Sequence, residues 1–133
     1  MTSLHCPFCF LTPDRIVSES ECTITIRDAF PVSEGHTLII SKRHVQSFFE
    51  LDTVERTAVL LAVEEAKNDL AGKYSPGGFN VGINDGEAAG QTVPHLHVHL
   101  IPRYKGDSKD PRGGVRWVIP EKARYWPPDE NGD

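Results

Sequence analysis

The amino-acid sequence predicts an α+β fold in which an antiparallel sheet is covered by one long helix. Short segments of alternating apolar and polar residues recur along the chain, as in strands that have one buried face. One longer segment, which starts at Asp52, instead has its apolar residues at helical spacing. A chain of 133 residues has the length of one domain, so we expect a single domain over residues 1–133.

Three strands are expected before that helix. Residues 16–17 and 23–26 alternate in the manner of strands. A loop at residues 28–35, marked by Pro and Gly, separates them from a central strand at residues 36–40. Residues 6–10, ahead of all three, predict a compact turn.

The long helix has clear start and stop signals. Asp52 and Glu55 have the spacing of a capping box, and Gly72 is a suitable C-terminal stop. Residues 47–50, just before it, predict a short helical turn. The face that we expect to be buried carries Val54, Ala58, Leu61, Ala62 and Ala66.

Two more strands are predicted after the helix, at residues 79–84 and 95–101, joined by a loop of small residues. From residue 102 the chain is polar, with Pro and Gly at intervals, and predicts a loop. Within this region residues 115–119 predict an edge strand, and we expect the tail to be frayed from Pro127.

Composition excludes several classes of protein. The chain is 38% hydrophobic and 25% charged, which is typical of a globular domain. Its net charge of −5 argues against a nucleic-acid partner, and no apolar run approaches the ~20 residues of a membrane span. No signal peptide is visible and the three cysteines are an odd number, so we expect a cytoplasmic protein without a disulfide framework.

Three histidines spaced by two are the most informative feature. His95, His97 and His99 alternate with apolar residues, so on a strand all three rings would share one face. Imidazole titrates near neutral pH and can act as a nucleophile, an acid or base, or a metal ligand. The plain alternative is a solvent-facing polar stripe.

A metal site is one reading of these residues. An H-x-H pair on a strand can chelate an ion, but Cys6 and Cys9 form a C-x-x-C pair at zinc-knuckle spacing and need two further ligands. A redox dithiol is the alternative for that pair, although the strand–helix context of thioredoxin is absent. The candidates for the remaining ligands are His5, His36, His44 and one member of the histidine row.

Covalent catalysis at phosphorus is another reading. A neutral imidazole attacks phosphoryl centres, and the phosphoramidate that it forms is labile to water. The loop before the row is rich in glycine, which lets the backbone approach a phosphate closely, and Thr92 adds a hydroxyl.

The run at residues 95–101 is similar to the signature of the histidine triad (HIT) family, His-φ-His-φ-His-φ-φ with φ apolar. Residues 84–93 resemble the phosphate loop of that family, and residues 28–44 resemble its ribose-side segment. The resemblance covers about residues 6–104, which would form the core of the domain. It implies a sheet of about five strands covered by one long and one short helix. It also implies a homodimer, with the long helix and one sheet edge at the interface.

The resemblance implies roles for individual residues. His97 would be the nucleophile, His99 would contact the phosphate oxygens, and His36 would be the buried histidine that orients the row. Gln91 and Thr92 would hold phosphate, and Asp28 would accept hydrogen bonds from the ribose. The complete set of implied substrate-binding residues is Asp28, Asn84, Gln91, Thr92, His99 and Phe8, with Phe8 as a wall for the base.

The zinc-containing members of the family also resemble this chain. By that likeness the ligands are Cys6, Cys9, His44 and His95. Four protein ligands leave no open position, so the zinc would be structural. No organic cofactor is expected.

The sequence therefore predicts a nucleotide hydrolase or transferase that cleaves at the α-phosphate of a dinucleoside polyphosphate or nucleoside phosphoramidate. The reaction would pass through a nucleotidyl-histidine intermediate, and a purine base is favoured. The alternative is a nucleotide-binding regulatory or scaffolding protein with little turnover. The C-terminal segment departs from the family pattern. Its residues Arg103, Lys105 and Arg112 would meet a polyphosphate leaving group or form a solvated basic loop.

Overall fold

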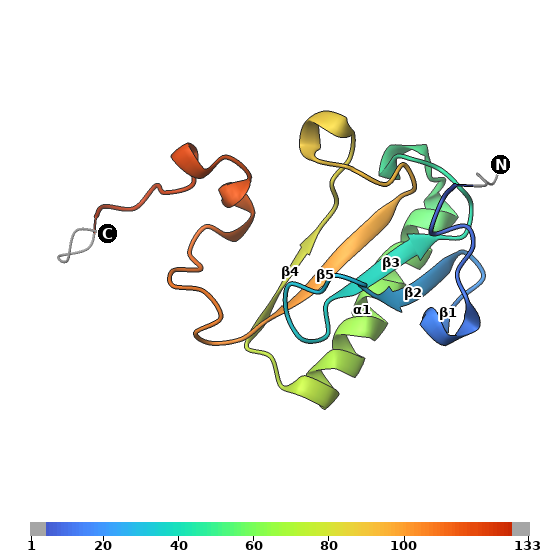
Figure 1. The fold of residues 1–133 in the computed structure, drawn as a ribbon, viewed down its shortest axis with the longest axis horizontal. Coiled ribbons are helices and arrows are strands. Elements are labelled where there is room, and N and C mark those ends of the chain that lie inside the picture. Colours follow the sequence, from blue (N-terminus) through green and yellow to red (C-terminus); the bar gives the residue numbers. More distant parts are fainter. Residues whose placement is uncertain (1–4, 129–133) are drawn as a thin grey trace.

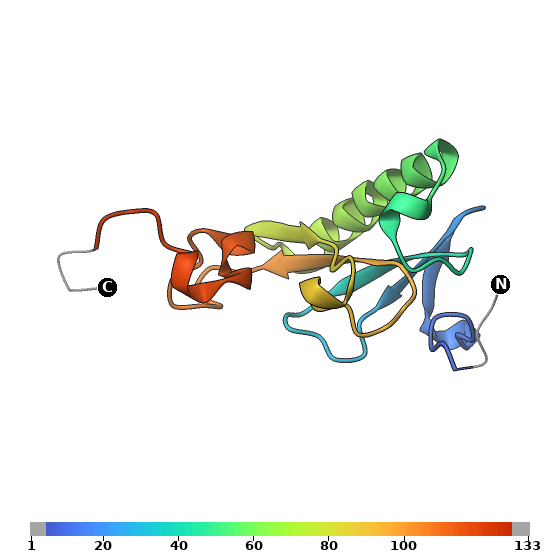
Figure 2. The ribbon, with the colours of Figure 1, turned by 90° about the horizontal axis from the view of Figure 1, so that it is seen from above.

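The sheet has five antiparallel strands in the order β1-β2-β3-β5-β4 (Figure 1). It is seen in a computed structural model that describes residues 5–128. One α-helix of this part of the chain, α1 (Thr53–Tyr74), covers one face of the sheet (Figure 2). The predicted α+β class is confirmed. The strands are β1 (Ile16–Glu19), β2 (Thr23–Arg27), β3 (Thr37–Ser41), β4 (Gly78–Gly82) and β5 (His97–Arg103).

Short 3-10 helices lie in the connections. The turn predicted at residues 47–50 is present, and Ser47 caps it by accepting a hydrogen bond from the backbone N–H of Phe49. Of the tail that was expected to be frayed, residues 129–133 lie outside the described residues. The 3-10 helices are η1 (Pro13–Arg15), η2 (Phe48–Glu50), η3 (Glu87–Ala89), η4 (Gly114–Val118) and η5 (Pro120–Lys122).

The start of α1 is the predicted capping box. The Asp52 carboxylate accepts from the backbone N–H of Glu55, and the Glu55 carboxylate accepts from that of Asp52. Together these bonds satisfy two donors that a helix start leaves free. Arg43 also binds Glu55 at 2.8 Å and, as the main cause, lowers the pKa of that carboxyl to about 2.

The buried face of α1 differs in part from the prediction. Ala62 and Ala66 are buried, but Val54 and Leu61 are 71% and 54% exposed. The sequence offers two overlapping apolar stripes at helical spacing. The one that fits the sheet consists of Val59, Ala62, Ala66 and Leu70.

The end of α1 also differs from the prediction. The helix continues through Gly72 to Tyr74 and stops at Ser75, which adopts the left-handed conformation with φ of 52°. Packing of the last turn against the loop at Gly35 explains this extension: a Cβ built on Gly35 would lie 2.8 Å from Leu70 and 3.2 Å from Tyr74. Close tertiary contact outweighs the weak helix propensity of Gly72.

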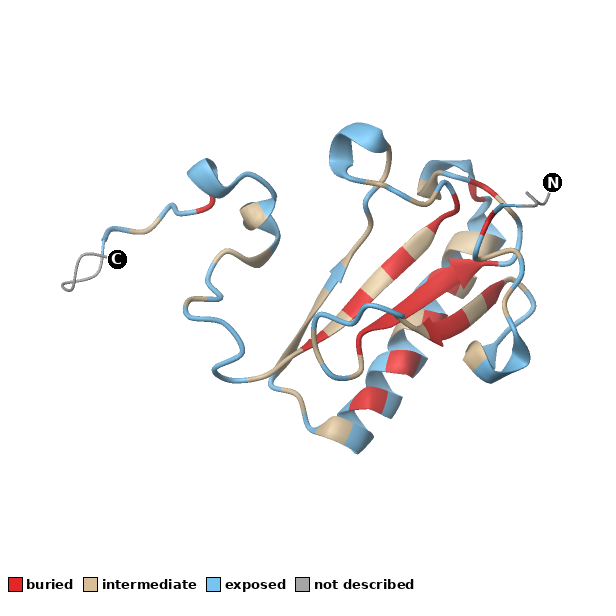
Figure 3. Ribbon diagram, viewed as in Figure 1, coloured by how far each residue is buried: buried red, intermediate tan, exposed pale blue. Residues whose placement is uncertain are grey.

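β5 divides its side chains between the two faces of the sheet. Val98 and Leu100 are buried in the core under α1, whereas His97 and His99 are half-buried on the opposite face. The central strand β3 is buried along its whole length (Figure 3) because both of its faces are covered. On the histidine face, Leu38 and Ile40 pack with Ile26 beneath residues of the N-terminal turn, Phe8 and Leu11.

His95 stands outside the strand. β5 begins at His97, and the backbone N–H of His95 donates to the carbonyl of Val93 in a bend just before it. The prediction of one strand carrying all three histidines is therefore correct for His97 and His99 only. Pro94 accounts for the difference, since it lacks the N–H that a central strand needs.

The edge strand predicted at residues 115–119 is wrong. Residues 115–118 instead belong to the 3-10 helix η4, which begins at Gly114 after the cap residue Gly113; these two glycines have φ of 41° and 89°. The backbone bonds stay local, from Arg116 to Gly113 and from Ile119 to Arg116. No helix among residues 5–128 has the length and apolar character needed to cross a membrane.

We expect opposite effects from adding one methyl group at two glycines. Gly35→Ala should lower the free energy of unfolding by about 2 kcal/mol, because it combines a positive φ with a clash against Leu70. Gly72→Ala should raise it by about 0.5–1 kcal/mol, since Gly72 lies in a helix with open space around it. Urea unfolding followed by circular dichroism measures both. Equal effects of the two substitutions would contradict this account.

Candidate functional site

A cavity of about 330 Å³ lies on the histidine face of the sheet, over β3 and β5. We call it the histidine pocket. It is bounded by the N-terminal turn, the loop after β2 and the loop before β5. Among its lining residues are Phe8, Asp28, Asn84, Thr92, His97 and His99, so the structure brings together six of the predicted site residues.

The ring of His97 is held by the backbone. Its Nδ1 lies 2.8 Å from the carbonyl oxygen of His95. A carbonyl only accepts, so Nδ1 carries the proton and Nε2 of the neutral ring keeps its lone pair. A nitrogen with a free lone pair is the one that could attack a phosphoryl centre.

His99 is oriented by His36. The backbone N–H of Val32 donates to His36 Nδ1 at 3.1 Å, which places the proton of the neutral His36 ring on Nε2. Nε2 lies 3.0 Å from His99 Nδ1 and donates to it. His99 therefore keeps its own proton on Nε2, the end away from His36. Burial lowers the pKa of both rings, which favours these neutral forms.

Asp28 is fixed in a turn beside the same pair. One carboxylate oxygen accepts from the backbone N–H of Phe30 at 2.8 Å, and the other lies 3.4 Å from His36 Nε2. Asp28, His36 and His99 lie close enough to chelate an ion. However, the proton on His36 Nε2 occupies the lone pair that a metal would need. The cluster is thus a hydrogen-bonded network.

Gln91 supports the loop before β5. Its carboxamide oxygen accepts from the N–H of Gly86, and its nitrogen donates to the carbonyls of Gln46 and Val93. It does not line the histidine pocket. Thr92, the next residue, does line it, so the carboxamide of Gln91 sets the loop that presents Thr92.

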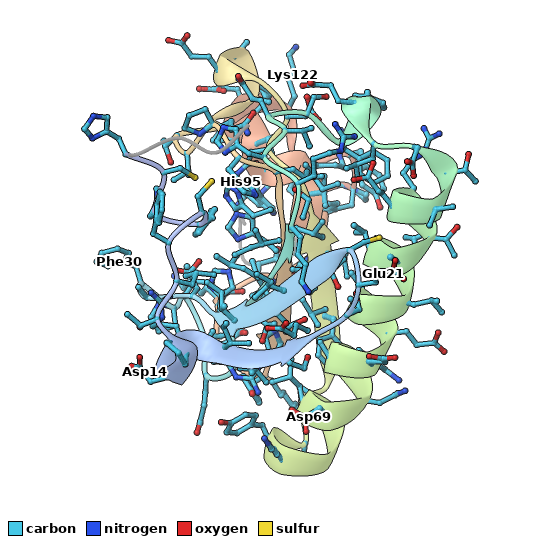
Figure 4. The ribbon with its side chains drawn as sticks, turned by 90° about the vertical axis from the view of Figure 1, so that its right-hand side faces the viewer. Asp14, Glu21, Phe30, Asp69, His95 and Lys122 are labelled. Atoms are coloured by element: carbon cyan, nitrogen blue, oxygen red, sulfur yellow. The ribbon has the colours of Figure 1, made fainter. Side chains whose placement is uncertain are left out.

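The sequence analysis did not identify two of the residues that line the histidine pocket. Arg15 and Phe30 line the histidine pocket, and Phe30 is 87% exposed (labelled in Figure 4). Neither belongs to a recognisable motif. Arg15 reaches the pocket through the pairing of β1 with β2, and its guanidinium donates to the carbonyl of Arg27.

The second cluster joins the N-terminal turn to the chain before β5. Cys6, Cys9, His44 and His95 have ligand atoms within 4.8 Å of one another, and Figure 4 shows two sulfur atoms beside His95. Nδ1 of His95 lies 3.3 Å from Cys6 Sγ and 3.1 Å from His44 Nδ1. Cys9 Sγ lies 3.1 Å from His44 Nδ1.

These separations, 3.1–3.6 Å, are close to those around a four-coordinate metal. Metal–sulfur bonds of about 2.3 Å and metal–nitrogen bonds of about 2.0–2.1 Å in a tetrahedron separate the donors by roughly 3.3–3.8 Å. His95 Nε2 lies 2.7 Å from the carbonyl of Ser41, which fixes its proton there and leaves Nδ1 free toward the cluster. The four residues could therefore bind a metal ion.

Comparisons with known proteins match this chain to one family. A family model for the HIT domain matches residues 11–106. An uncharacterized HIT-like protein of Mycoplasma genitalium is 39% identical over 108 residues, which cover 78% of this chain and 77% of that protein. A bis(5′-adenosyl)-triphosphatase of Saccharomyces cerevisiae is 32% identical over 124 residues, which cover 92% of this chain but 56% of the yeast protein.

Solved structures share the fold. A HIT family protein from Bacillus anthracis has a TM-score of 0.72 and 38% identity, covering 80% of this chain and 78% of that one. A Zn-bound histidine triad family protein from Mycobacterium smegmatis has a TM-score of 0.70 and 29% identity, covering 90% and 94%. Because the family model matches most of the chain and the histidine row lies within that match, the protein belongs to the HIT domain family.

Proposed function

We propose that this protein is a nucleotide hydrolase that cleaves nucleoside 5′-phosphoryl substrates at the α-phosphorus, with His97 as the nucleophile. The observation that carries the proposal is the bond from His97 Nδ1 to the carbonyl of His95. It leaves an unprotonated Nε2 on a half-buried ring that lines a pocket of nucleotide size. The name of the yeast triphosphatase supports hydrolysis of a phosphoric anhydride.

The pocket offers suitable partners for each part of a nucleotide. Phe8 and Phe30 would contact the base, with a purine favoured, and Asp28 would accept from the ribose hydroxyls. Thr92 and the Nε2–H of His99 would donate to the phosphate oxygens. Asn84, also at the pocket, would contact the ribose and phosphate.

The reaction would proceed in two displacements. His97 Nε2 attacks the α-phosphorus in line, the bond from phosphorus to the leaving oxygen breaks, and the leaving group departs with the electron pair. A water oxygen then attacks the nucleotidyl-histidine, and the phosphorus–nitrogen bond breaks. The ring regains its lone pair and a nucleoside monophosphate is released, while the proton of the water passes to the solvent. Donors on His99 and Thr92 stabilise the charge on the phosphate oxygens in both steps.

For the metal we propose zinc in a structural role. Two thiolates and two imidazoles are a donor set that zinc prefers. The Zn-bound relative from Mycobacterium smegmatis supports this assignment. Four protein ligands leave no open position, so the ion would fasten the N-terminal turn to His95 and take no part in the displacement.

We also propose that the chain forms homodimers through the outer face of α1 and one sheet edge. Val54, Leu60 and Leu61 are exposed on α1, and they give that face the apolar surface a partner would cover.

His97→Asn should lower turnover at least about 1000-fold while AMP binding stays within about threefold, because asparagine keeps the shape but offers no nucleophile. Steady-state kinetics and calorimetry measure the two quantities. Mass spectrometry of rapidly quenched wild-type protein should show a nucleotide on His97. Turnover that survives the substitution would refute the nucleophile. A wild-type protein that binds AMP without turnover or adduct would favour the scaffolding alternative.

Nitrogen-15 NMR of the imidazoles should report the proton positions. We expect the proton of His97 on Nδ1 and those of His36 and His99 on Nε2. At pH 6.5 a free imidazole is half protonated. The lowered pKa of His36 and of His99 should keep both rings neutral at that pH. A doubly protonated His36 at pH 6.5, or a proton on Nε2 of His97, would contradict the arrangement.

Elemental analysis should find about one zinc per chain. Cys9→Ser should lose most of this metal and several degrees of melting temperature, since it removes one of four ligands. Cys22→Ser is the matched control, because Cys22 is the free cysteine outside the cluster. A zinc content near zero in the wild type, or equal metal loss in both variants, would refute the assignment.

A further inference from the structure

A second, larger cavity of about 1150 Å³ adjoins the histidine pocket on the same face of the sheet. We call it the outer cavity. Its floor is β4 and β5, where Asn80 and Gly82 lie opposite Ile101 and His99. Its far wall is the segment of residues 107–124, which stands off from the sheet beyond β4 (orange to red in Figure 1).

The two cavities meet at the reacting centre of the proposed function. His99 and Asn84 line both of them. An in-line displacement needs the leaving group opposite the attacking nitrogen, and the nucleoside oxygen lies to the side of that axis among the equatorial oxygens. A group that leaves the α-phosphorus beside His99 would therefore pass into the outer cavity.

The outer cavity is positively charged in a protein of net charge −5. Four cationic and two acidic side chains line it, a net charge of +2. Arg103 and Arg112, which the sequence suggested for the leaving group, are bound at 2.8 and 2.9 Å to Asp107 and Asp110. The third candidate, Lys105, does not line the cavity.

Two cations of the outer cavity have no carboxylate within ion-pair distance among residues 5–128. They are Lys109 and Arg124, both exposed. Arg124 instead lies over the ring of Trp117, 5.5 Å from its centroid. After the hydrogen bond from Arg112, the charge of Arg124 also helps to lower the pKa of the Asp110 carboxyl. Both cations can still attract anions such as phosphate groups into the hollow.

The far wall beyond these cations is aromatic and aliphatic. Trp117 lines the cavity, and its indole N–H donates to the carbonyl of Arg112 at 2.8 Å, which holds the ring in place. Val115 and Val118, on the same 3-10 helix, are 65% and 73% exposed and also line the cavity. A fixed aromatic ring with apolar neighbours suits the flat face of a nucleobase.

We infer that the outer cavity binds the leaving half of a dinucleoside polyphosphate, with its phosphates at Lys109 and Arg124 and its nucleobase against Trp117. This inference rests on the proposed function and selects among its substrates. His99, the two cations and Trp117 offer partners for the α-phosphate, the phosphate chain and the second base. A small amine would leave most of 1150 Å³ unfilled.

The residues that carry this inference lie outside the matched family region. That match ends at residue 106, whereas the two cations and Trp117 lie beyond it. Preference for the leaving group would thus be a property of this chain's own C-terminal segment.

The test compares two substrates that share one adenosine 5′-phosphoryl group. Diadenosine tetraphosphate has a large anionic leaving group, and adenosine 5′-phosphoramidate has a small one. The double variant Lys109→Gln, Arg124→Gln should lower kcat/KM about tenfold for the tetraphosphate and less than twofold for the phosphoramidate. The control, Lys67→Gln with Lys122→Gln, removes the same charge outside the cavity and should leave both values unchanged.

Substitution of Trp117 tests the base contact. Trp117→Leu should lower kcat/KM for the tetraphosphate about tenfold, and Trp117→Phe should restore most of it because it keeps a ring. An equal loss of kcat/KM on both substrates would overturn the inference. The same loss in the control variant Lys67→Gln, Lys122→Gln would also overturn it.

Binding to the His97→Asn protein separates this inference from the proposed function. Calorimetry should show diadenosine tetraphosphate binding at least about tenfold more tightly than AMP, and Trp117→Leu should remove that difference. If the wild type turns over neither substrate, the proposed function fails. The calorimetric measurement still tests whether the outer cavity binds the second nucleotide. Equal affinity for the two nucleotides would overturn the outer-cavity assignment whatever the turnover.

Discussion

The pairing of β5 with β3 is the constraint on which the site depends. His97 lies opposite Ile40 and His99 opposite Leu38, on the face away from α1. Their neighbours Val98 and Leu100 are buried beneath the helix. Because side chains alternate, a shift of one residue in register would bury both imidazoles and expose both aliphatic side chains. The hydrophobic core under α1 therefore holds the histidine face of the sheet in position.

His95 connects the two chemical centres. Its carbonyl holds the ring of His97, and its own ring bonds to Ser41 on one side and faces Cys6 and His44 on the other. A metal at the cluster would thus stiffen the backbone that orients His97, the proposed nucleophile. The proposed structural ion and the proposed chemistry would be coupled through one residue, although the ion takes no part in the displacement.

Spacing and caps in the sequence predict much of this structure. The two-residue spacing of the histidines correctly predicts that His97 and His99 share one face of a strand. The capping box at Asp52 correctly predicts the start of α1. The same spacing does not predict the position of His95, because β5 begins only at His97, after Pro94. The sequence also predicts the clusters around His97 and His95 as candidate sites. The histidine spacing and the C-x-x-C pair are local motifs, whereas the full set Cys6, Cys9, His44 and His95 follows only from the resemblance to zinc-containing members of the family.

The remaining differences come from contacts that no local pattern encodes. Two apolar stripes compete on α1, and the fit to the sheet selects the one with Leu70 over the one with Leu61. Gln91 has the residue type expected at a phosphate, but two backbone groups of its own loop and the carbonyl of Gln46 engage its carboxamide. Arg15 enters the site because β1, the strand that follows it, pairs with β2.

The C-terminal segment is held mostly by itself. Arg116 donates to the carbonyls of Lys122 and Ala123, and Ala123 is the one buried residue among residues 105–128 (Figure 3). Such a unit opens with a smaller free energy than a strand buried on both faces, so its amide hydrogens would exchange with solvent long before those of β3. Ligand release could then follow local opening of this segment while the sheet and its histidines stay folded.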